Sequence, residues 1–293
     1  MNPVTPAEYR QEAEALSGPL PPLLAEAEHL AQTVLLGFHG RRRGGMGDEF
    51  WQYRPARDGD AARMIDWRRS ARSDAHFVQE KEWQAAQSVF LWLDEAQSMD
   101  FTGDQARLPK GQLGKLIALA LSILLIRGGE RVALASLGTP PRSSELQLLR
   151  IAQSFAMDKD RTDYGMPEVR NLLPHARAAF ISDFMGDLAP LERELGKAAD
   201  RGVRGALLQI LDPHEEAFPF DGRTIFESMG KSLRHETLKA ADLRDRYIER
   251  LQQRKERLEE LAYLSGWQYS CHHTGNSAQQ ALLWVYTALE RKP

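Results

Sequence analysis

The stretch "SVFLWLDEAQSMD", residues 88–100, begins with an unbroken apolar run that ends at Asp94. Such a run is typical of a strand whose two faces are both buried, as in a parallel sheet covered by helices. Similar runs occupy residues 131–138, 177–183 and 204–212, with a weaker candidate at 267–273. Helical stretches lie between them, at residues 110–127, 144–156, 187–201, 238–264 and 277–290. The alternation predicts an α/β fold with a doubly wound, mostly parallel sheet of Rossmann type.

Three of the predicted strands end in an aspartate, namely Asp94, Asp183 and Asp212. In open parallel sheets, ligands bind outside the carboxyl ends of the strands, near the point where the strand order reverses. A carboxylate at such a position also caps a neighbouring helix well, because it accepts hydrogen bonds from free backbone N–H groups. The sequence leaves two roles open for these residues: helix caps, or part of a polar surface that a partner recognises.

The segment after the first strand, "DEAQS", resembles the D-x-S-x-S motif of von Willebrand factor A-type domains. In that family, oxygen ligands hold Mg²⁺, a hard cation that prefers them. Asp94 and Ser98 match the motif, and Asp183 stands at the position of the family's second aspartate. Ala96 replaces the first serine, and its methyl group offers no lone pair. One direct metal ligand of the family is therefore missing here.

A second departure lies in "YGMPEV", where Met166 stands at the position of the threonine that supplies the family's third hydroxyl. Thr162, four residues earlier, would serve only if the loop were displaced. The sequence predicts a degenerate metal site at Asp94, Ser98 and Asp183, and no resident cofactor. The alternative is a divalent-metal-dependent enzyme, or a metal-regulated binder, that uses these three residues with Mg²⁺.

A longer segment, residues 44–99, resembles the domain-of-unknown-function-58 family, whose pattern is roughly G-x-G-x-E-F, an arginine, then D-x-x-R-x-I-D-W-x-x-S-A-R. The matching residues are Gly45, Gly47, Glu49, Phe50, Arg54, Asp60, Arg63, Ile65, Asp66, Trp67, Ser70, Ala71 and Arg72. With "DPHEEAFPFDGRTIF" and "LRDRYIERL", the resemblance covers about residues 30–290. It implies a bacterial von Willebrand A-like domain that acts as an adaptor or co-chaperone for a MoxR-type AAA+ ATPase and an unidentified client protein.

The N-terminal part of the chain is rich in arginine. Residues 41–72 hold nine arginines, at 41, 42, 43, 54, 57, 63, 68, 69 and 72, against five acids, with aromatic residues interleaved. Interspersed acids largely cancel the field, so we expect internal ion pairs or a protein-docking face, with nucleic-acid binding as the weaker alternative. The motif residues expected to carry these roles are Arg54, Arg63, Asp66, Trp67, Ser70 and Arg72.

The sequence divides into residues 1–84, a helical segment followed by the arginine-rich extended region, and residues 85–293, the α/β domain with a long charged helix near 238–264. No basic, apolar leader is visible at the N-terminus, and the most apolar run, residues 113–126, is shorter than a membrane span. We therefore expect a cytoplasmic protein. Phosphate-binding, zinc-protease and nucleophile-elbow motifs are missing from the sequence. We expect a non-enzymatic protein-interaction module whose partner hydrolyses ATP.

Overall fold

The computed structural model describes residues 22–38, 50–56, 65–70, 77–81, 86–157, 161–167, 172–228 and 234–290. They fall into two compact units. The larger contains helix α2 (Pro22–Phe38), almost to its end, and the chain from Gln87 onwards. The smaller lies within residues 38–86.

The larger unit is built on a five-stranded sheet in which every neighbouring pair is parallel. Its strands lie in the order β4 (Arg131–Leu134), β3 (Ser88–Leu93), β5 (Arg177–Ser182), β6 (Arg204–Leu211) and β9 (Gln268–His273). All five occur where the sequence predicted them. The run at 131–138 is shorter than predicted, because residues 135–137 form a 3-10 turn before Gly138, whose φ is 60°.

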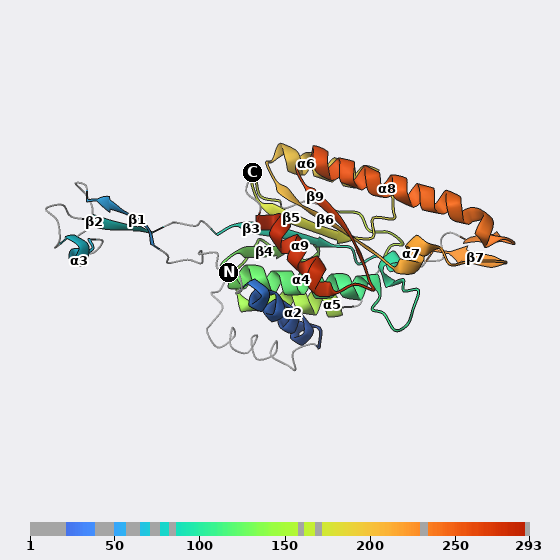
Figure 1. The fold of residues 1–293 in the computed structure, drawn as a ribbon, viewed down its shortest axis with the longest axis horizontal. Coiled ribbons are helices and arrows are strands. Elements are labelled where there is room, and N and C mark those ends of the chain that lie inside the picture. The colour runs from blue at the N-terminus through green and yellow to red at the C-terminus, as the bar shows by residue number, and fades with distance from the viewer. Residues whose placement is uncertain are drawn as a thin grey trace, which may run out of the picture. The chain divides into compact units, whose positions relative to one another are not determined.

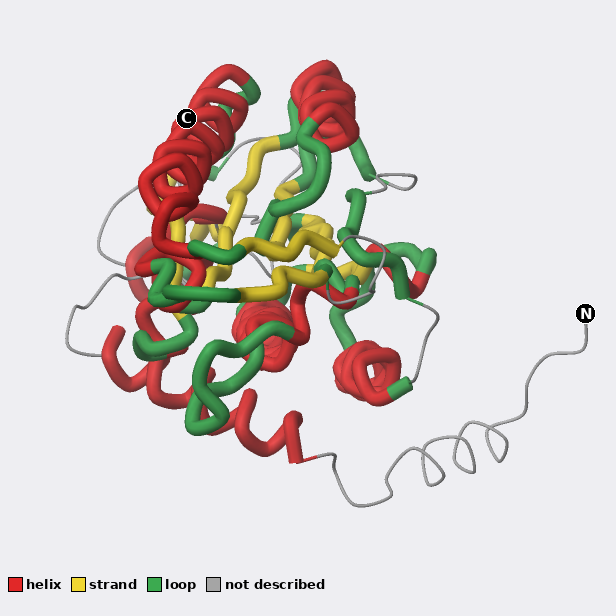
Figure 2. The backbone as a smooth tube through the Cα atoms, turned by 90° about the vertical axis from the view of Figure 1, so that its right-hand side faces the viewer, coloured by secondary structure: helices red, strands yellow, loops and turns green. Residues whose placement is uncertain are grey.

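Helices cover both faces of this sheet (Figure 1; Figure 2). One face packs against α2, α4 (Lys110–Arg127), α5 (Glu145–Ala156) and α9 (Ala278–Glu290) around a large apolar core. The other face packs against α6 (Ala189–Asp200) and α8 (Arg244–Leu264), whose buried residues include Leu195, Leu258 and Leu261. The predicted doubly wound α/β fold is confirmed.

Helix α2 belongs to the larger unit, whereas the sequence analysis grouped it with the arginine-rich region in residues 1–84. Leu24, Ala27, Ala31 and Val34 recur at helical spacing and are buried in the same core as α4 and α9. The packing of this apolar stripe therefore decides which unit the helix joins. The predicted helical residues before Pro22 lie outside the described ranges.

A short helix and a hairpin extend the sheet's carboxyl edge. Helix α7 (Pro213–Ala217) follows β6, and strands β7 (Thr224–Glu227) and β8 (Arg234–Thr237) pair antiparallel beyond it. The rings of Phe218, Phe220, Phe226 and Tyr247 pack together and join this segment to the start of α8. The sequence analysis did not predict the hairpin, and it began the long helix at 238 rather than at Arg244.

The smaller unit contains an antiparallel pair, β1 (Phe50–Pro55) and β2 (Phe77–Lys81), and one helical turn, α3 (Trp67–Ser70). The Ser70 hydroxyl donates to the backbone oxygen of Asp66 (2.8 Å) and accepts from the backbone N–H of Phe77 (2.9 Å). Ser70 is therefore a structural link between the turn and β2. Trp67 is 57% exposed. Arg63, Arg72, residues 41–43 and the side chain of Arg54 lie outside what the structure describes, so their predicted roles stay predictions.

The close packing of β6 against its neighbours gives a stability test at Gly205. A Cβ atom there would lie 2.1 Å from the backbone oxygen of Ala178. Because that oxygen belongs to the adjoining strand, we expect Gly205→Ala to lower the free energy of unfolding by about 1–3 kcal/mol or more, measured by urea denaturation.

The matched control is Gly196→Ala in α6, where an added Cβ would meet no atom within 4 Å. This change should raise the free energy of unfolding by about 0.5–1 kcal/mol, because alanine favours a helix interior over glycine. Equal effects of the two substitutions would contradict the packing described for β6.

Candidate functional site

The order of the strands places a switch point between β3 and β5. From β3 the chain crosses to β4 on one side, and the later strands β5, β6 and β9 add on the other side. In doubly wound sheets the crevice at the carboxyl edge beside this point is the usual ligand site. Asp94 directly follows β3 and Asp183 directly follows β5, so two of the three predicted aspartates flank the switch point.

Asp94 is 2% exposed, and its carboxylate is held by groups of the protein itself. It accepts hydrogen bonds from the backbone N–H of Ala96 (2.8 Å) and the hydroxyl of Ser182 (2.7 Å). Burial raises the pKa of Asp94, and the nearby Asp183 carboxylate raises it further. The hydrogen bonds lower the pKa but do not outweigh burial. The oxygens of Asp94 are thus already used in ordering the loop that follows β3.

The loop at residues 161–167, which holds Thr162 and the Met166 that stands at the threonine position, lies beside this loop. The backbone N–H groups of Gln97 and Ser98 donate to the backbone oxygens of Thr162 and Asp163, both at 2.9 Å. At Gly165 an added Cβ would lie 2.1 Å from an Asp94 carboxylate oxygen, so only glycine allows this approach. The two loops form one rigid edge above β3.

The hydroxyls expected from the two loops do not converge on a cation. The Thr162 hydroxyl donates to the backbone oxygen of Tyr164 (2.9 Å), and the Met166 side chain is 59% exposed. Ser98 is buried, and its hydroxyl has no hydrogen-bond partner among the described residues. Ser98 is the one predicted ligand that keeps an uncommitted oxygen.

Lys110, the first residue of α4, carries a fully buried positive charge at the same edge. Its ammonium lies 2.9 Å from a carboxylate oxygen of Asp183 and 2.6 Å from one of Glu215, and the side chain is 1% exposed. Burial opposes the charged form, but the two carboxylates outweigh it and raise the pKa of Lys110. Burial raises the pKa of Glu215 in spite of Lys110. The charge that a metal ion would bring to Asp183 is supplied by the protein.

These residues do not fit a resident divalent cation. Asp183 already pairs with an ammonium, Asp94 accepts hydrogen bonds from the protein, and Ala96 has no oxygen in its side chain. A lone hydroxyl, that of Ser98, would be left to coordinate a hard cation that demands near-octahedral oxygen ligation. The degenerate site predicted at Asp94, Ser98 and Asp183 and the metal-dependent alternative both stay predictions.

The third aspartate, Asp212, has the capping role that the sequence left open. It follows β6 and caps α7, accepting from the backbone N–H of His214 while Glu215 accepts from the Asp212 N–H. Burial by itself would raise its pKa. Four donors outweigh burial and lower the pKa of Asp212 to about 2: the backbone N–H groups of His214 and Gly103, and the side chains of Thr274 and Arg107.

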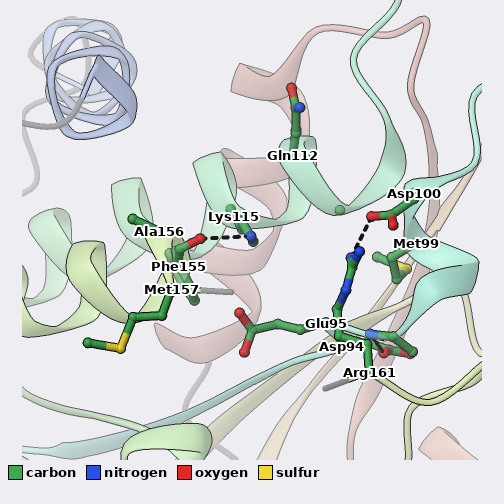
Figure 3. A pocket seen from close by; sticks show the side chains of 12 residues that line it. Asp94, Glu95, Met99, Asp100, Gln112, Lys115, Phe155, Ala156, Met157 and Arg161 are labelled. Carbon is green, nitrogen blue, oxygen red and sulfur yellow. Dashed lines mark hydrogen bonds and ion pairs between the residues drawn. The ribbon is translucent and has the colours of Figure 1, made fainter. Parts of the chain in front are cut away.

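Two hollows open on either side of the Asp94 loop. One, of about 290 Å³, lies between that loop and helices α4 and α5, with Lys115, Met157 and Arg161 on its walls (Figure 3). The other, of about 320 Å³, lies towards β4 and is lined in part by Trp92 and Met166. Met157 and Met166 are 66% and 59% exposed. The surface above the switch point is therefore hollowed and carries flexible apolar side chains.

Sequence reasoning missed two of the residues that define this edge, Lys110 and Glu215. Lys110 appeared there only as the first residue of the predicted helix at 110–127, and Glu215 only as part of the family segment "DPHEEAFPFDGRTIF". Their partners lie far away along the chain, at separations of 73 residues from Asp183 to Lys110 and 105 from Glu215 to Lys110. The one local signal was the capping box, Asp212 with Glu215, which marks the start of a helix.

Comparison with known families gives a match to the model described as "Protein of unknown function DUF58", over residues 52–257. The chain belongs to the DUF58 family. The resemblance stated from the sequence is thus confirmed for the family. A search of curated proteins found no match.

Three solved structures are distantly similar to this DUF58 protein. Conserved hypothetical protein BatB from Bacteroides thetaiotaomicron shares 14% identity over 70% of this chain and 98% of its own, with a TM-score of 0.41. An aerotolerance-related membrane protein from Bacteroides fragilis NCTC 9343, with multiple mutations to serines, shares 14% identity over 70% of this chain and 98% of its own, with a TM-score of 0.39. An uncharacterized membrane spanning protein from Vibrio fischeri shares 16% identity over 71% of this chain and 100% of its own, with a TM-score of 0.22.

The cytoplasmic location expected from the sequence is contradicted by this comparison, because two of these structures are described as membrane proteins. The expectation rested on the missing leader and the short apolar run, and we withdraw it. Across the ranges that the structure describes, none of the helices has both the length and the apolarity needed to cross a bilayer.

The buried Lys110 ion pairs can be tested by stability measurements. Lys110→Met removes the ammonium and leaves the Asp183 and Glu215 carboxylates buried without it, so we expect a loss of about 3–5 kcal/mol in the free energy of unfolding. Adding Asp183→Asn and Glu215→Gln in the same chain should recover most of that loss, because neutral amides need no counter-charge.

The control for this test is Lys115→Met, on the same helix. The Lys115 ammonium donates to the backbone oxygen of Phe155 and pairs with no carboxylate among the described residues. A loss from Lys110→Met no larger than that from Lys115→Met would contradict the account of this edge.

Asp212 gives a pH-dependent prediction. Its folded pKa of about 2 lies below the ordinary value of 3.8, so it stabilises the fold above about pH 4, and this contribution is lost as the pH falls from about 4 towards 2. Asp212→Asn should cost about 2 kcal/mol at pH 7, at 1.36 kcal/mol per pKa unit. Urea denaturation from pH 3 to 7 should show the difference from wild type shrinking in acid. A difference that does not change with pH would refute this assignment.

Proposed function

We propose that this DUF58 protein is a non-enzymatic adaptor that binds another polypeptide at the carboxyl edge of its sheet, without a metal ion at Asp94, Ser98 and Asp183. The observation that carries the proposal is the pair of hollows that flank the Asp94 loop, with exposed methionines on their walls. Hollows of this size accept single side chains of a partner, and anchors buried in this way supply most of the affinity at protein interfaces.

The chemistry of the surface favours a polypeptide. Methionine adapts its shape to different apolar groups, and Met157 and Met166 stand on opposite sides of the Asp94 loop. Around them lie charged side chains of both signs, Glu95, Asp100 and Arg161, with Arg161 bound to Asp100 at 2.8 Å. The charged residues line the same hollow as Met157, so this surface offers a partner both apolar and charged contacts.

The hydrogen bonds and ion pairs beneath the two hollows favour binding of a partner over catalysis. Asp94 accepts hydrogen bonds from two protein groups, and Lys110 is held between Asp183 and Glu215. Groups committed in this way hold the loops in one conformation, which lowers the entropy cost of binding a partner. They are not poised to exchange protons with a substrate.

The partner that we propose is a MoxR-type AAA+ ATPase, with a client protein brought to it by the adaptor. The proposal rests on what the resemblance to this family implies, because the matched family is itself described as of unknown function. In this scheme the ATPase hydrolyses ATP, and the DUF58 protein contributes a binding surface.

The test is co-purification of the full chain with a MoxR-type ATPase, with and without ATP. The double variant Met157→Lys and Met166→Lys should weaken binding at least tenfold, because two charges would enter apolar contacts. EDTA should leave the affinity of the wild-type chain unchanged.

A matched control is Tyr263→Lys, at a side chain that is 82% exposed. Tyr263 lies at the end of α8, just before β9. Because β9 is parallel to the other strands, Tyr263 lies at the amino edge of the sheet, opposite the hollows. Failure to associate in either nucleotide state would refute the proposed partner. Equal losses from the methionine and tyrosine variants would refute the proposed surface.

A further inference from the structure

The outer strand β9 presents a sulfur and a nitrogen ligand on one face. Cys271 and His273 are two residues apart on this strand, and alternate residues of a strand point to the same side. His272, between them, points to the opposite side and is 6% exposed. Two adjacent residues of a strand cannot bind one ion together within that strand, so His272 takes no part with His273.

A third ligand comes from α7. One ligand atom each of Glu216, Cys271 and His273 lies within 4.8 Å of the others, and the Nε2 atom of His273 is 2.7 Å from a carboxylate oxygen of Glu216. The capping box at Asp212 fixes the start of α7, and β9 pairs with β6 as far as Leu211 and His273. Both elements that carry the three residues are therefore anchored to the same end of β6.

We propose that Glu216, Cys271 and His273 form a binding site for Zn²⁺ or a similar transition-metal ion. Thiolate, imidazole and carboxylate are the three ligand types that proteins use for zinc, and three protein ligands leave a fourth position for water or another ligand. The side chains of Glu216 and His273 are 32% and 26% exposed, so an ion can reach them from solvent. The site is separate from the degenerate site at Asp94, Ser98 and Asp183.

Lys255 of α8 is the internal competitor for this site. Its ammonium contacts the other carboxylate oxygen of Glu216 and hydrogen-bonds to Cys271. A divalent ion would bring two positive charges to one thiolate and one carboxylate, which balances the site without Lys255. The lysine side chain is 20% exposed on a flexible stem, so its head can move to solvent when a metal binds.

Proton release should accompany metal binding. Burial raises the pKa of the Cys271 thiol, although Lys255 opposes this, so the ion must displace a proton from sulfur. Burial and Lys255 lower the pKa of His273, while the Asp212 and Glu215 carboxylates act against them. A neutral imidazole keeps the lone pair that a metal needs.

The experiment is a Co²⁺ titration of the full-length, metal-free chain, followed by its thiolate-to-cobalt absorption. Cys271 is the single cysteine of the sequence, so such a band can arise only from this residue. We expect a band that saturates at one ion per chain and is displaced by Zn²⁺. Cys271→Ser should abolish it, and His273→Ala and Glu216→Gln should each weaken binding at least tenfold.

The Lys255→Met variant distinguishes this site from adventitious binding, because removing the competing ammonium should tighten Co²⁺ binding at least tenfold. A measurement on the unmodified chain needs no variant: Zn²⁺ should slow the reaction of Cys271 with a thiol reagent. The proposal is overturned if the wild-type chain shows no band and Zn²⁺ gives no protection, or if a band appears only in Lys255→Met. Binding that is unchanged in both His273→Ala and Glu216→Gln would also overturn it.

Discussion

The carboxyl edge of this sheet depends on one buried ammonium, that of Lys110, held between the carboxylates of Asp183 and Glu215. It joins three parts of the chain: the start of α4, the end of β5 and the helix after β6. An isolated charge with 1% exposure would be very costly, and so would either carboxylate without it. Pairing of the one ammonium with these two carboxylates lets the carboxyl edge of the sheet carry buried charged groups.

This interaction also explains how the site departs from the metal-binding pattern that it resembles. At the two positions where the sequence resembles that pattern least, Ala96 and Met166 offer no side-chain oxygen to a cation. Here the second aspartate has an internal counter-charge, and the first is held by Ser182 and a backbone N–H. What remains at the surface is shape and apolar contact, which suits recognition of a polypeptide.

Two lysines act at the same end of the sheet, with different exposure. Lys110 is fully buried between its carboxylates, whereas Lys255 is 20% exposed beside Glu216 and Cys271. The buried Lys110 ammonium has no access to solvent and stays with its two carboxylates. The partly exposed Lys255 ammonium can move into solvent when an ion binds. The first lysine therefore stays paired with Asp183 and Glu215, and the second would yield its place to an ion that binds sulfur and nitrogen.

Much of the fold could be predicted from local patterns, because apolar runs and helical spacing are properties of neighbouring residues. The five strands, the helix at 110–127 and the aspartates that end β3, β5 and β6 all follow from such patterns. The partners of Lys110 could not be predicted, since only the folded sheet brings residues 110, 183 and 215 together. For the same reason the sequence pointed to Ala96 and Met166 and not to Lys110.

The most direct test of this account is a crystal structure of the protein soaked in Mn²⁺, with data collected to show its anomalous scattering. The account predicts no anomalous peak within bonding distance of Asp94, Ser98 or Asp183, and the Lys110 ammonium still in contact with Asp183 and Glu215. An octahedral ion coordinated by Ser98 and Asp183, with Lys110 displaced, would contradict it.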